Sequence, residues 1–369
     1  MSRIPLIKPD VRWNDVADDI AEVLESGMLT GGAHVAAFED EIAAICGVDH
    51  AVATTSATTA LQLALAALDI GPGDEVIVSD FTFPATANAV LAVGATPVLT
   101  DSHPDGFAVD PDAIRAALTT RTAAIMPVDP FGQPADYATI EKIAADAGVP
   151  VVADAACSLG SSRDGRAAGA HGLMGCFSFH PRKMITCGEG GMVTTDDAGL
   201  ADRLRSLRSH GMERHGIAMR FVEPAFNFRM SEIQAVLGRS QLPRFDDTLI
   251  DRRRVAARYD EHLTSIDTVD VPTPTDDATW SYQSYVIVLD DSIDRDALVL
   301  AMREVDIETT IGTYACHNHP AYEDLGYTPG QLPHSARFER QALTLPLVPG
   351  MADTTVDHVV HNLRTLLEV

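Results

Sequence analysis

Lysine, cysteine and long apolar runs are all scarce in this chain. Only three of its 27 basic residues are lysines, and its 53 acidic residues give a formal net charge of −26. A surface with this excess of negative charge repels nucleic acid and anionic lipid, so neither is expected as a partner. No stretch approaches the roughly 20 uninterrupted apolar residues of a membrane-spanning helix. The composition therefore predicts a soluble globular protein.

The five cysteines are odd in number, widely spread and nowhere arranged as C-x-x-C, which argues against a disulfide scaffold or a zinc site. The closest set of possible ligands, Cys316, His317 and His319, has the spacing of ordinary loop residues, so no metal is predicted. The chain starts without a basic leader followed by an apolar segment, which predicts a cytoplasmic protein. Its acidic, lysine-poor surface suits a salt-rich cytoplasm, because salt screens the self-repulsion.

Length and apolar content predict two domains. Between about residues 49 and 154, short β-branched runs alternate with helical stretches, which is typical of a parallel sheet covered on both faces. The clearest unit is a strand over 123–128, a helix over 137–147 and a strand over 149–154. After Leu242 come a long helix, a Pro/Thr/Asp-rich connector, a strand at 285–289 and two further helices. We predict a large domain over 1–245 and a smaller α+β domain over 246–369.

Lys183 is the first candidate for chemistry, because arginine replaces nearly every other lysine and only a primary amine forms an imine. Lys8, in the N-terminal segment, and Lys142, on the polar face of a predicted helix, have ordinary surface explanations. Lys183 lies between an apolar stretch and a glycine-rich turn, which suits a buried Schiff-base lysine. Taken alone, a solvated lysine in a turn explains the position equally well.

Asp154 ends a buried strand, so its carboxylate is expected at the carboxyl edge of the sheet, where open α/β folds bind ligands. A carboxylate there can keep a pyridine nitrogen protonated. A helix N-cap is the alternative explanation.

The stretch from Thr55 to Thr59 ends a strand and starts a helix, which is a possible phosphate site but also the usual form of a capped βα turn. Phe81 and Phe83 follow the next strand. One of them could stack on a planar ring, whereas core packing is the ordinary explanation.

Several motifs occur in order along the chain and resemble one family. They are Ser178-Phe-His-Pro-Arg-Lys with Gly188-Glu-Gly-Gly-Met, Asp154-Ala-Ala-Cys-Ser-Leu-Gly, Gly132-Gln-Pro-Ala-Asp, and Asn227-Phe-Arg-Met-Ser-Glu-Ile-Gln-Ala. From Ile4 to the last predicted helix, the chain resembles the DegT/DnrJ/EryC1/StrS family of pyridoxal-phosphate-dependent sugar aminotransferases. The resemblance implies an α/β protein with the type I fold: a large, mostly parallel sheet domain with helices on both faces, and a smaller C-terminal α+β domain. It also implies bound pyridoxal 5'-phosphate and a homodimer with shared active sites.

The resemblance assigns roles to individual residues. Lys183 corresponds to the Schiff-base lysine that also moves the proton, and Asp154 to the partner of the pyridine nitrogen. Phe83 corresponds to the ring-stacking aromatic, and Asn227 to a phosphate contact from the neighbouring subunit. The phosphate positions within the chain are Ala57, Thr58 and Ser178. The chain departs from the family at Cys157, where Gln or His is usual beside the ring hydroxyl, and at Ala57, where Gly is usual.

The reaction that the resemblance implies moves an amino group from L-glutamate to a nucleotide-linked 3-keto or 4-keto hexose by a ping-pong mechanism. The sugar diphosphate needs a basic patch, for which the candidates are Arg220, Arg229, His317 and His319.

The sequence suggests four alternatives to this reaction. A sugar dehydratase of this fold carries histidine in place of Lys183. A synthase of the aminohydroxybenzoate type keeps the lysine and is separable only by assay. A non-catalytic regulatory member predicts damaged Lys183 and Asp154 motifs, which are intact. A nicotinamide dehydrogenase lacks support because no G-x-G-x-x-G follows the first strand, and no P-loop is present.

Overall fold

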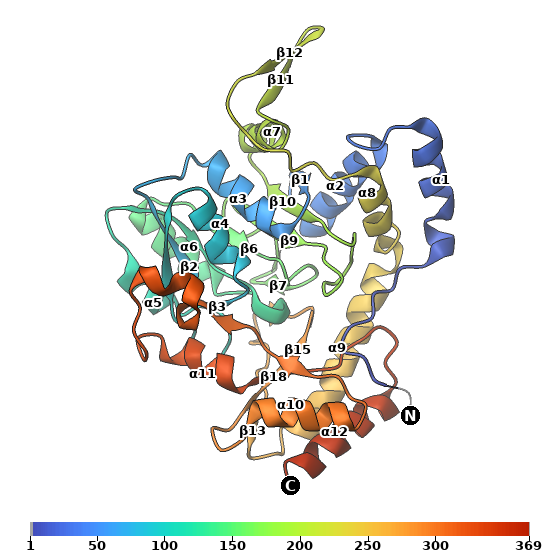
Figure 1. Cartoon of the computed structure of the whole chain (residues 1–369), viewed down its shortest axis with the longest axis vertical. Coiled ribbons are helices and arrows are strands. Elements are labelled where there is room, and N and C mark those ends of the chain that lie inside the picture. The colour runs from blue at the N-terminus through green and yellow to red at the C-terminus, as the bar shows by residue number, and fades with distance from the viewer. Residues whose placement is uncertain (1–2, 369) are drawn as a thin grey trace.

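A mixed seven-stranded sheet forms the centre of the molecule, as the computed structural model of residues 3–368 shows (Figure 1). Strands β4-β2-β5 and β6-β9-β10-β1 form one sheet because bridges join Ile125 to Val151 and Val128 to Asp154. Every strand runs parallel to its neighbours except β10, which is antiparallel to both. The strands are β1 (His50–Thr54), β2 (Glu75–Ser79), β4 (Thr96–Thr100), β5 (Thr122–Met126), β6 (Val152–Asp154), β9 (Met174–Ser178) and β10 (Gly191–Thr195).

Helices cover both faces of this sheet, because successive side chains of its strands point to opposite sides. Along β5, Ala124 and Met126 join the core under one set of helices, whereas Ile125 joins the core on the other side. The first face carries α3 (Ala57–Ala67), α4 (Ala85–Ala92) and α7 (Ala198–Leu207). The opposite face carries α2 (Ala33–Cys46), α5 (Pro111–Ala117) and α6 (Tyr137–Ala147). This confirms the predicted fold class.

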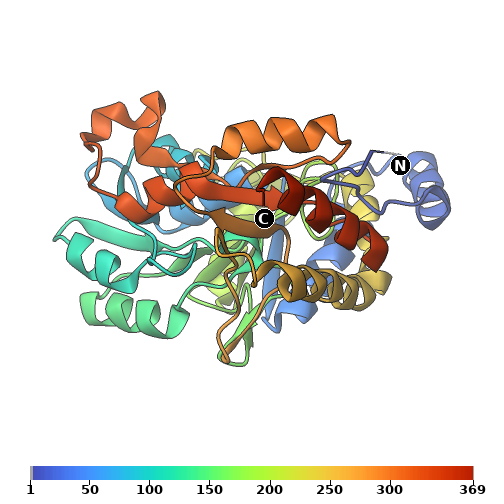
Figure 2. The ribbon, with the colours of Figure 1, turned by 90° about the horizontal axis from the view of Figure 1, so that it is seen from below.

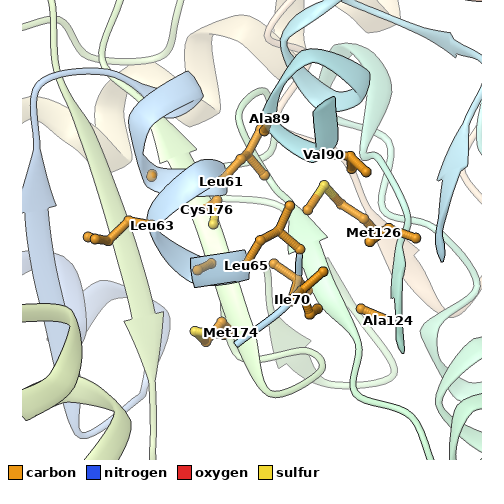
Figure 3. Packing of buried hydrophobic residues seen from close by; sticks show 14 of the residues in the cluster. Leu61, Leu63, Leu65, Ile70, Ala89, Val90, Ala124, Met126, Met174 and Cys176 are labelled. Carbon is orange, nitrogen blue, oxygen red and sulfur yellow. The ribbon is translucent and has the colours of Figure 1, made fainter. Parts of the chain in front are cut away.

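Helix α3 is the central helix of the first face and points its N-terminus at the carboxyl edge of β1. Ser56 caps it, accepting a hydrogen bond from the Thr59 N–H, and the Thr59 hydroxyl accepts one from the Ser56 N–H. Its side chains are almost all apolar because neighbours surround it, as Figure 3 shows for three fully buried leucines, Leu61, Leu63 and Leu65. The tight packing fixes the position of the helix N-terminus.

A second, antiparallel sheet in the order β13-β15-β18-β16 carries its own apolar core. Its strands are β13 (Val269–Asp270), β15 (Tyr285–Leu289), β16 (Thr310–Ile311) and β18 (Ala342–Leu345). It packs with α9 (Phe245–Leu263), α10 (Arg295–Glu304) and α12 (Asp353–Leu366). Figure 2 shows α12 lying between the other two helices.

Two segments cross between these bodies. Near the N-terminus, the Ile4 N–H donates to the Asp306 carbonyl, and Ile4 packs into the core of the second sheet. In the other direction, β17 (Tyr314–Ala315) pairs with β3 (Phe81–Thr82), and the Tyr327 hydroxyl accepts from the Leu99 N–H on β4. The division at residue 245 stays a prediction, and both crossings depend on contacts far apart in the sequence.

The remaining elements lie around the two sheets. The hairpin of β11 (Met212–His215) and β12 (Ala218–Phe221) projects from the body beyond α7 (Figure 1). No helix within residues 3–368 combines the length and apolar character that crossing a membrane requires. The other elements are α1 (Ala17–Ser26), α8 (Glu232–Arg239), α11 (Pro333–Gln341), β7 (Ser162–Arg163), β8 (Arg166–Ala167), β14 (Ala278–Thr279) and the short 3-10 turns at 13–15, 130–132, 242–244, 316–318 and 320–325.

Candidate active site

Asp154 lies in the interior at the carboxyl end of β6. Its Oδ2 accepts a 2.7 Å hydrogen bond from the Thr86 hydroxyl, and its Oδ1 accepts one of 3.2 Å from the Ala156 N–H. Burial raises the pKa of Asp154, although these hydrogen bonds and the charge of Lys183 act in the opposite direction. The chain turns after Asp154 without starting a helix, so the N-cap alternative is not realised.

Lys183 lies in the loop between β9 and β10. Two hydrogen bonds hold this loop in place: the Phe179 N–H donates to the Gly190 carbonyl, and the Cys187 N–H donates to the Phe179 carbonyl. The half-buried Lys183 directs its amine at the turn after Asp154, where Nζ donates to Cys157 Sγ over 2.9 Å. The sequence alone leaves open a solvated lysine in a turn, but this half-buried amine is held by the Cys157 sulfur. Lys183 and Asp154 therefore lie at one edge of the large sheet.

The N-terminus of α3 offers free hydrogen-bond donors at the same edge. The first N–H groups of a helix have no acceptor within it, and here the Ser56 side chain takes only that of Thr59. A Cβ on Gly191 of β10 would lie 2.3 Å from the Ser56 carbonyl oxygen, so only glycine lets β10 pass this close. Ser178 is opposite Gly191 in the β9–β10 register. The N–H groups of Ala57 and Thr58 and the Ser178 hydroxyl can thus hold a phosphate.

Phe81 and Phe83 have opposite environments although they are two residues apart. Phe81 is fully buried among other aromatic rings, whereas Phe83 is 66% exposed, and its ring centroid lies 6.4 Å from that of Tyr314. Core packing therefore explains Phe81 but not Phe83. The Phe83 carbonyl oxygen lies 3.3 Å from the Thr86 hydroxyl, which is also 2.7 Å from Asp154 Oδ2, so the Phe83 backbone and the Asp154 carboxylate share this neighbour.

Arg220 lies on the β11–β12 hairpin, and Asn227 and Arg229 lie in the segment that follows it. Asn227 is exposed, in a bridge with Ser209, just after the β11–β12 hairpin. Arg220 is exposed on β12, opposite Glu213, and Arg229 is half-buried. None of the hydrogen bonds described for residues 3–368 joins these side chains to the site residues of the same chain, so their roles stay predictions.

The two candidate histidines bind carboxylates of the protein itself. The His317 Nδ1 lies 2.6 Å from Asp80 Oδ2, and the His317 N–H donates to Asp80 Oδ1 over 2.8 Å. Both side chains are almost completely buried, which places His317 in the interior rather than at a surface that a sugar diphosphate reaches. Although burial opposes it, the hydrogen bond to Asp80 raises the pKa of His317. His319 is partly exposed and pairs with Glu339 over 2.7 Å.

Asp129 is a site residue that sequence reasoning missed. It follows β5, its N–H donates to the Asp154 carbonyl, and its carboxylate accepts from the hydroxyls of Tyr137 and Ser158. Burial raises the pKa of Asp129 to about 6, against those hydrogen bonds. Its position after a buried strand is the same signal that identified Asp154.

A cavity of about 80 Å³ borders the loop that carries Lys183. Asp154 and Cys157 do not line it. It lies between the N-terminal segment, α9 and the second sheet, and its lining includes Lys8 and Arg182. The sequence placed Lys8 at an ordinary surface, but the structure brings it to the same cavity as Lys183.

The groups at this edge of the sheet fit pyridoxal phosphate. The free N–H groups of α3 match its phosphate, the buried carboxylate matches its ring nitrogen, the exposed Phe83 ring matches its flat face, and the Lys183 amine matches its aldehyde. A mixed sheet with β10 reversed, together with this donor set, defines a type I pyridoxal-phosphate-dependent transferase.

Comparisons with known proteins identify the family. The model of the DegT/DnrJ/EryC1/StrS aminotransferase family matches residues 12–364, so the chain belongs to that family. It is a pyridoxal-phosphate-dependent aminotransferase.

Relatives of known structure or annotated role agree with this assignment. The chain is 38% identical over 364 residues to the spore coat polysaccharide biosynthesis protein SpsC of Bacillus subtilis (strain 168), covering 95% of this chain and 94% of that protein. The structure of DesI with its TDP-sugar product is 33% identical, with a TM-score of 0.91 over 99% and 93% of the chains. The PLP form of the sugar aminotransferase Spr1654 of Streptococcus pneumoniae is 27% identical, with a TM-score of 0.94 over 99% of each chain.

Proposed function

We propose that this enzyme transfers the amino group of L-glutamate to the keto carbon of a nucleotide-linked hexose, in two half-reactions of a ping-pong mechanism. The product is an amino sugar for a polysaccharide or a glycosylated metabolite. The observation that carries the proposal is the position of the Lys183 amine, which donates to Cys157 in the turn that follows the buried Asp154 at one sheet edge. The names of SpsC and of the DesI complex support a sugar acceptor.

Each residue of the site has a separate role in the proposed reaction. Pyridoxal phosphate, when bound, supplies an electron sink for the electrons released when a C–H bond breaks. The Lys183 Nζ would hold its aldehyde, and the same amine, when free, would move the proton between the substrate carbon and the cofactor carbon. Asp154 would accept a hydrogen bond from the ring nitrogen and keep it protonated, because among residues 3–368 only the neutral Thr86 hydroxyl and Ala156 N–H donate to its carboxylate. Phe83 orients the ring, while Ala57, Thr58 and Ser178 hold the phosphate.

Glutamate and a sugar diphosphate are both anions, whereas the protein carries a net charge of −26. The cavity beside the Lys183 loop carries positive charges in this otherwise acidic protein. Neither Lys8 nor Arg182 belongs to any ion pair described for residues 3–368, although most arginines of the chain do. We propose that these two cations attract the anionic substrates to the site.

We propose a homodimer whose subunits complete each other's sites. Exposed apolar side chains gather on the α1 region and on the projecting hairpin, where Trp13 is 71% exposed and Phe221 is 68% exposed. Such patches are typical of interaction surfaces. Asn227 is exposed in the segment after the hairpin, and we expect it to contact the phosphate in the partner subunit's site. All five cysteines are free, which supports a reducing compartment such as the cytoplasm.

Hybrid dimers test the shared site. Lys183→Arg and Asn227→Ala lie in different halves of each proposed site, so mixing the two inactive variants restores one intact site per hybrid dimer. We expect activity to return after subunit exchange, measured as amino-sugar formation. If exchange is demonstrated by differently tagged subunits and no activity returns, the shared site is wrong.

A substrate assay tests the reaction itself. The enzyme is incubated with L-glutamate and a panel of nucleotide-linked 3-keto and 4-keto hexoses, and both 2-oxoglutarate and the aminated sugar are measured by mass spectrometry. We expect the two products in equal amounts with at least one sugar and neither with Lys183→Arg. If glutamate yields no 2-oxoglutarate with any sugar, the proposal fails, and the regulatory and aminohydroxybenzoate alternatives regain support.

A further inference from the structure

Cys157 and Lys183 form a thiol–amine pair that the aminotransferase reaction does not require. Their side chains come from segments 26 residues apart in sequence, and Lys183 Nζ lies 2.9 Å from Cys157 Sγ. The turn that holds Cys157 is fixed by the hydrogen bond from the Ala156 N–H to Asp154, and the Ser281 hydroxyl donates to the Cys157 carbonyl over 3.4 Å. The sulfur therefore lies in contact with the one amine on which the site depends.

Cys157 is also the most accessible cysteine of the chain. It is half-buried, whereas the other four cysteines are buried. Burial raises the pKa of each of those four thiols, that of Cys46 to about 12. Because thiol oxidation follows thiolate character and exposure, an oxidant is expected to reach Cys157 first.

We propose that peroxide joins Cys157 to Lys183 through a reversible sulfur–nitrogen bond whenever the lysine amine is not engaged by the cofactor. In the first step the thiol is oxidised to a sulfenic acid, and peroxide is reduced to water. In the second step the nitrogen lone pair attacks the sulfur, the S–N bond forms, the S–O bond breaks, and the leaving hydroxide takes a proton from the nitrogen to give water. The protein loses two hydrogen atoms in total, and a dithiol reductant restores both side chains.

The bond consumes the amine that the cofactor needs, so oxidation and cofactor binding exclude each other. An enzyme cycling between its two half-reactions exposes the free amine each time the amino group rests on the cofactor. Oxidation of that form would stop turnover while protecting the sulfur from irreversible oxidation. The inference rests on the proposed role of Lys183 only for the protection by cofactor, not for the bond itself.

The test compares two forms of the holoenzyme after treatment with hydrogen peroxide. One form carries pyridoxal phosphate, and the other has been converted with excess L-glutamate, which frees Lys183. Each is digested without reductant and analysed by mass spectrometry for a cross-link between the peptides that contain Cys157 and Lys183. We expect the cross-link, lighter by two hydrogens, in the glutamate-treated form, its absence in the pyridoxal phosphate form, and its loss after dithiothreitol.

Matched variants separate the bond from general oxidation. Cys157→Ser keeps a similar size and removes the sulfur, and Lys183→Arg keeps the charge and removes the amine nucleophile, so neither should give the cross-link. The four buried cysteines serve as internal controls and should remain unmodified. A sulfenic acid at Cys157, trapped by dimedone, beside an unlinked Lys183 in the glutamate-treated form would overturn the proposal, as would an unoxidised Cys157. Borohydride labelling of Lys183 in untreated protein tests its cofactor role separately.

Discussion

Asp154 and Asp80 are two buried carboxylates at the carboxyl ends of strands in one sheet, and their surroundings differ. Asp80 has an ionisable partner in His317, which contacts both of its oxygens, one through the ring and one through the backbone N–H. Asp154 has only neutral donors at hydrogen-bond distance among the described residues, the Thr86 hydroxyl and the Ala156 N–H. Asp80 therefore has an ionisable group at hydrogen-bond distance, whereas Asp154 has none among the described residues.

The difference separates a structural acid from a functional one. A buried carboxylate without a cation is unfavourable, because burial penalises its charged form. The penalty at Asp154 is removed when a protonated pyridine nitrogen binds beside it. Asp80 instead ties the segment of His317 to the end of β2, through the Cys316 N–H that donates to the Asp80 carbonyl as well as through the side chains. Four substitutions test this contrast, in order of decreasing effect.

Asp154→Asn should lower turnover by roughly 100-fold or more, because a neutral amide does not keep the ring nitrogen protonated. The free energy of unfolding of the cofactor-free protein should be unchanged or higher, since an uncompensated buried charge is removed. Steady-state kinetics and urea denaturation measure the two effects. A large loss of stability with unchanged turnover per folded enzyme would place Asp154 in the same class as Asp80.

Asp80→Asn should show the opposite pattern. Removing one partner of a buried pair leaves His317 without its counter-charge and should lower the free energy of unfolding by about 3 kcal/mol. The visible absorbance of bound cofactor should be retained in the folded fraction. His317→Asn is the matched control and should cause a similar loss. If either variant instead abolishes sugar binding in a stable protein, the predicted substrate role of His317 gains support.

Asp129→Asn extends the comparison of buried carboxylates to the pH dependence of the free energy of unfolding. The pKa of Asp129 is about 6 in the folded protein and 3.8 without burial, so between these values the folded state binds the proton more tightly than the unfolded state. The free energy of unfolding should therefore fall as pH rises from about 4 to 6. Urea denaturation at several pH values should show a smaller slope for the variant than for the wild type. An identical slope in both would contradict the raised pKa of Asp129.

Phe83→Leu should have the smallest effect. Loss of the stacked ring should weaken cofactor binding by about 1 kcal/mol, with little change in stability because Phe83 is exposed. Phe81→Leu is the matched control and should lower stability by about 1 kcal/mol without weakening cofactor binding, because Phe81 is in the core. Fluorescence titration with pyridoxal phosphate and thermal unfolding distinguish the two. Reversed outcomes would exclude Phe83 as the stacking residue.

Local signals explain why much of the fold was predictable. The helix over 137–147 is confirmed at both ends, because Asp136 caps its start and Gly148 takes the left-handed conformation that ends it. The strand expected over 149–154 is shorter, covering only Val152–Asp154 as a continuous strand. The reversed direction of β10 depends on pairing between distant segments, and no local pattern expresses it. The same holds for the return of Tyr314 and its neighbours to the large sheet.

The candidate site was predictable where a residue type carried its own chemistry. Lys183 was conspicuous because the chain has so few lysines, and Asp154 because it ends a buried strand. Asp129 carries the same signal as Asp154 and was missed because no family motif drew attention to it. The pairing of His317 with Asp80 was not predictable, because the two residues are 237 positions apart.

Borohydride reduction of the protein with bound pyridoxal phosphate, followed by peptide mapping, tests most directly that Lys183 is the lysine of the cofactor site. The chain contains only two other lysines, Lys8 and Lys142, so the assignment is unambiguous. We predict that the reduced label lies on Lys183 and that L-glutamate added before reduction prevents it. A label on either of the other two lysines, or a label on Lys183 that glutamate does not prevent, would contradict the account.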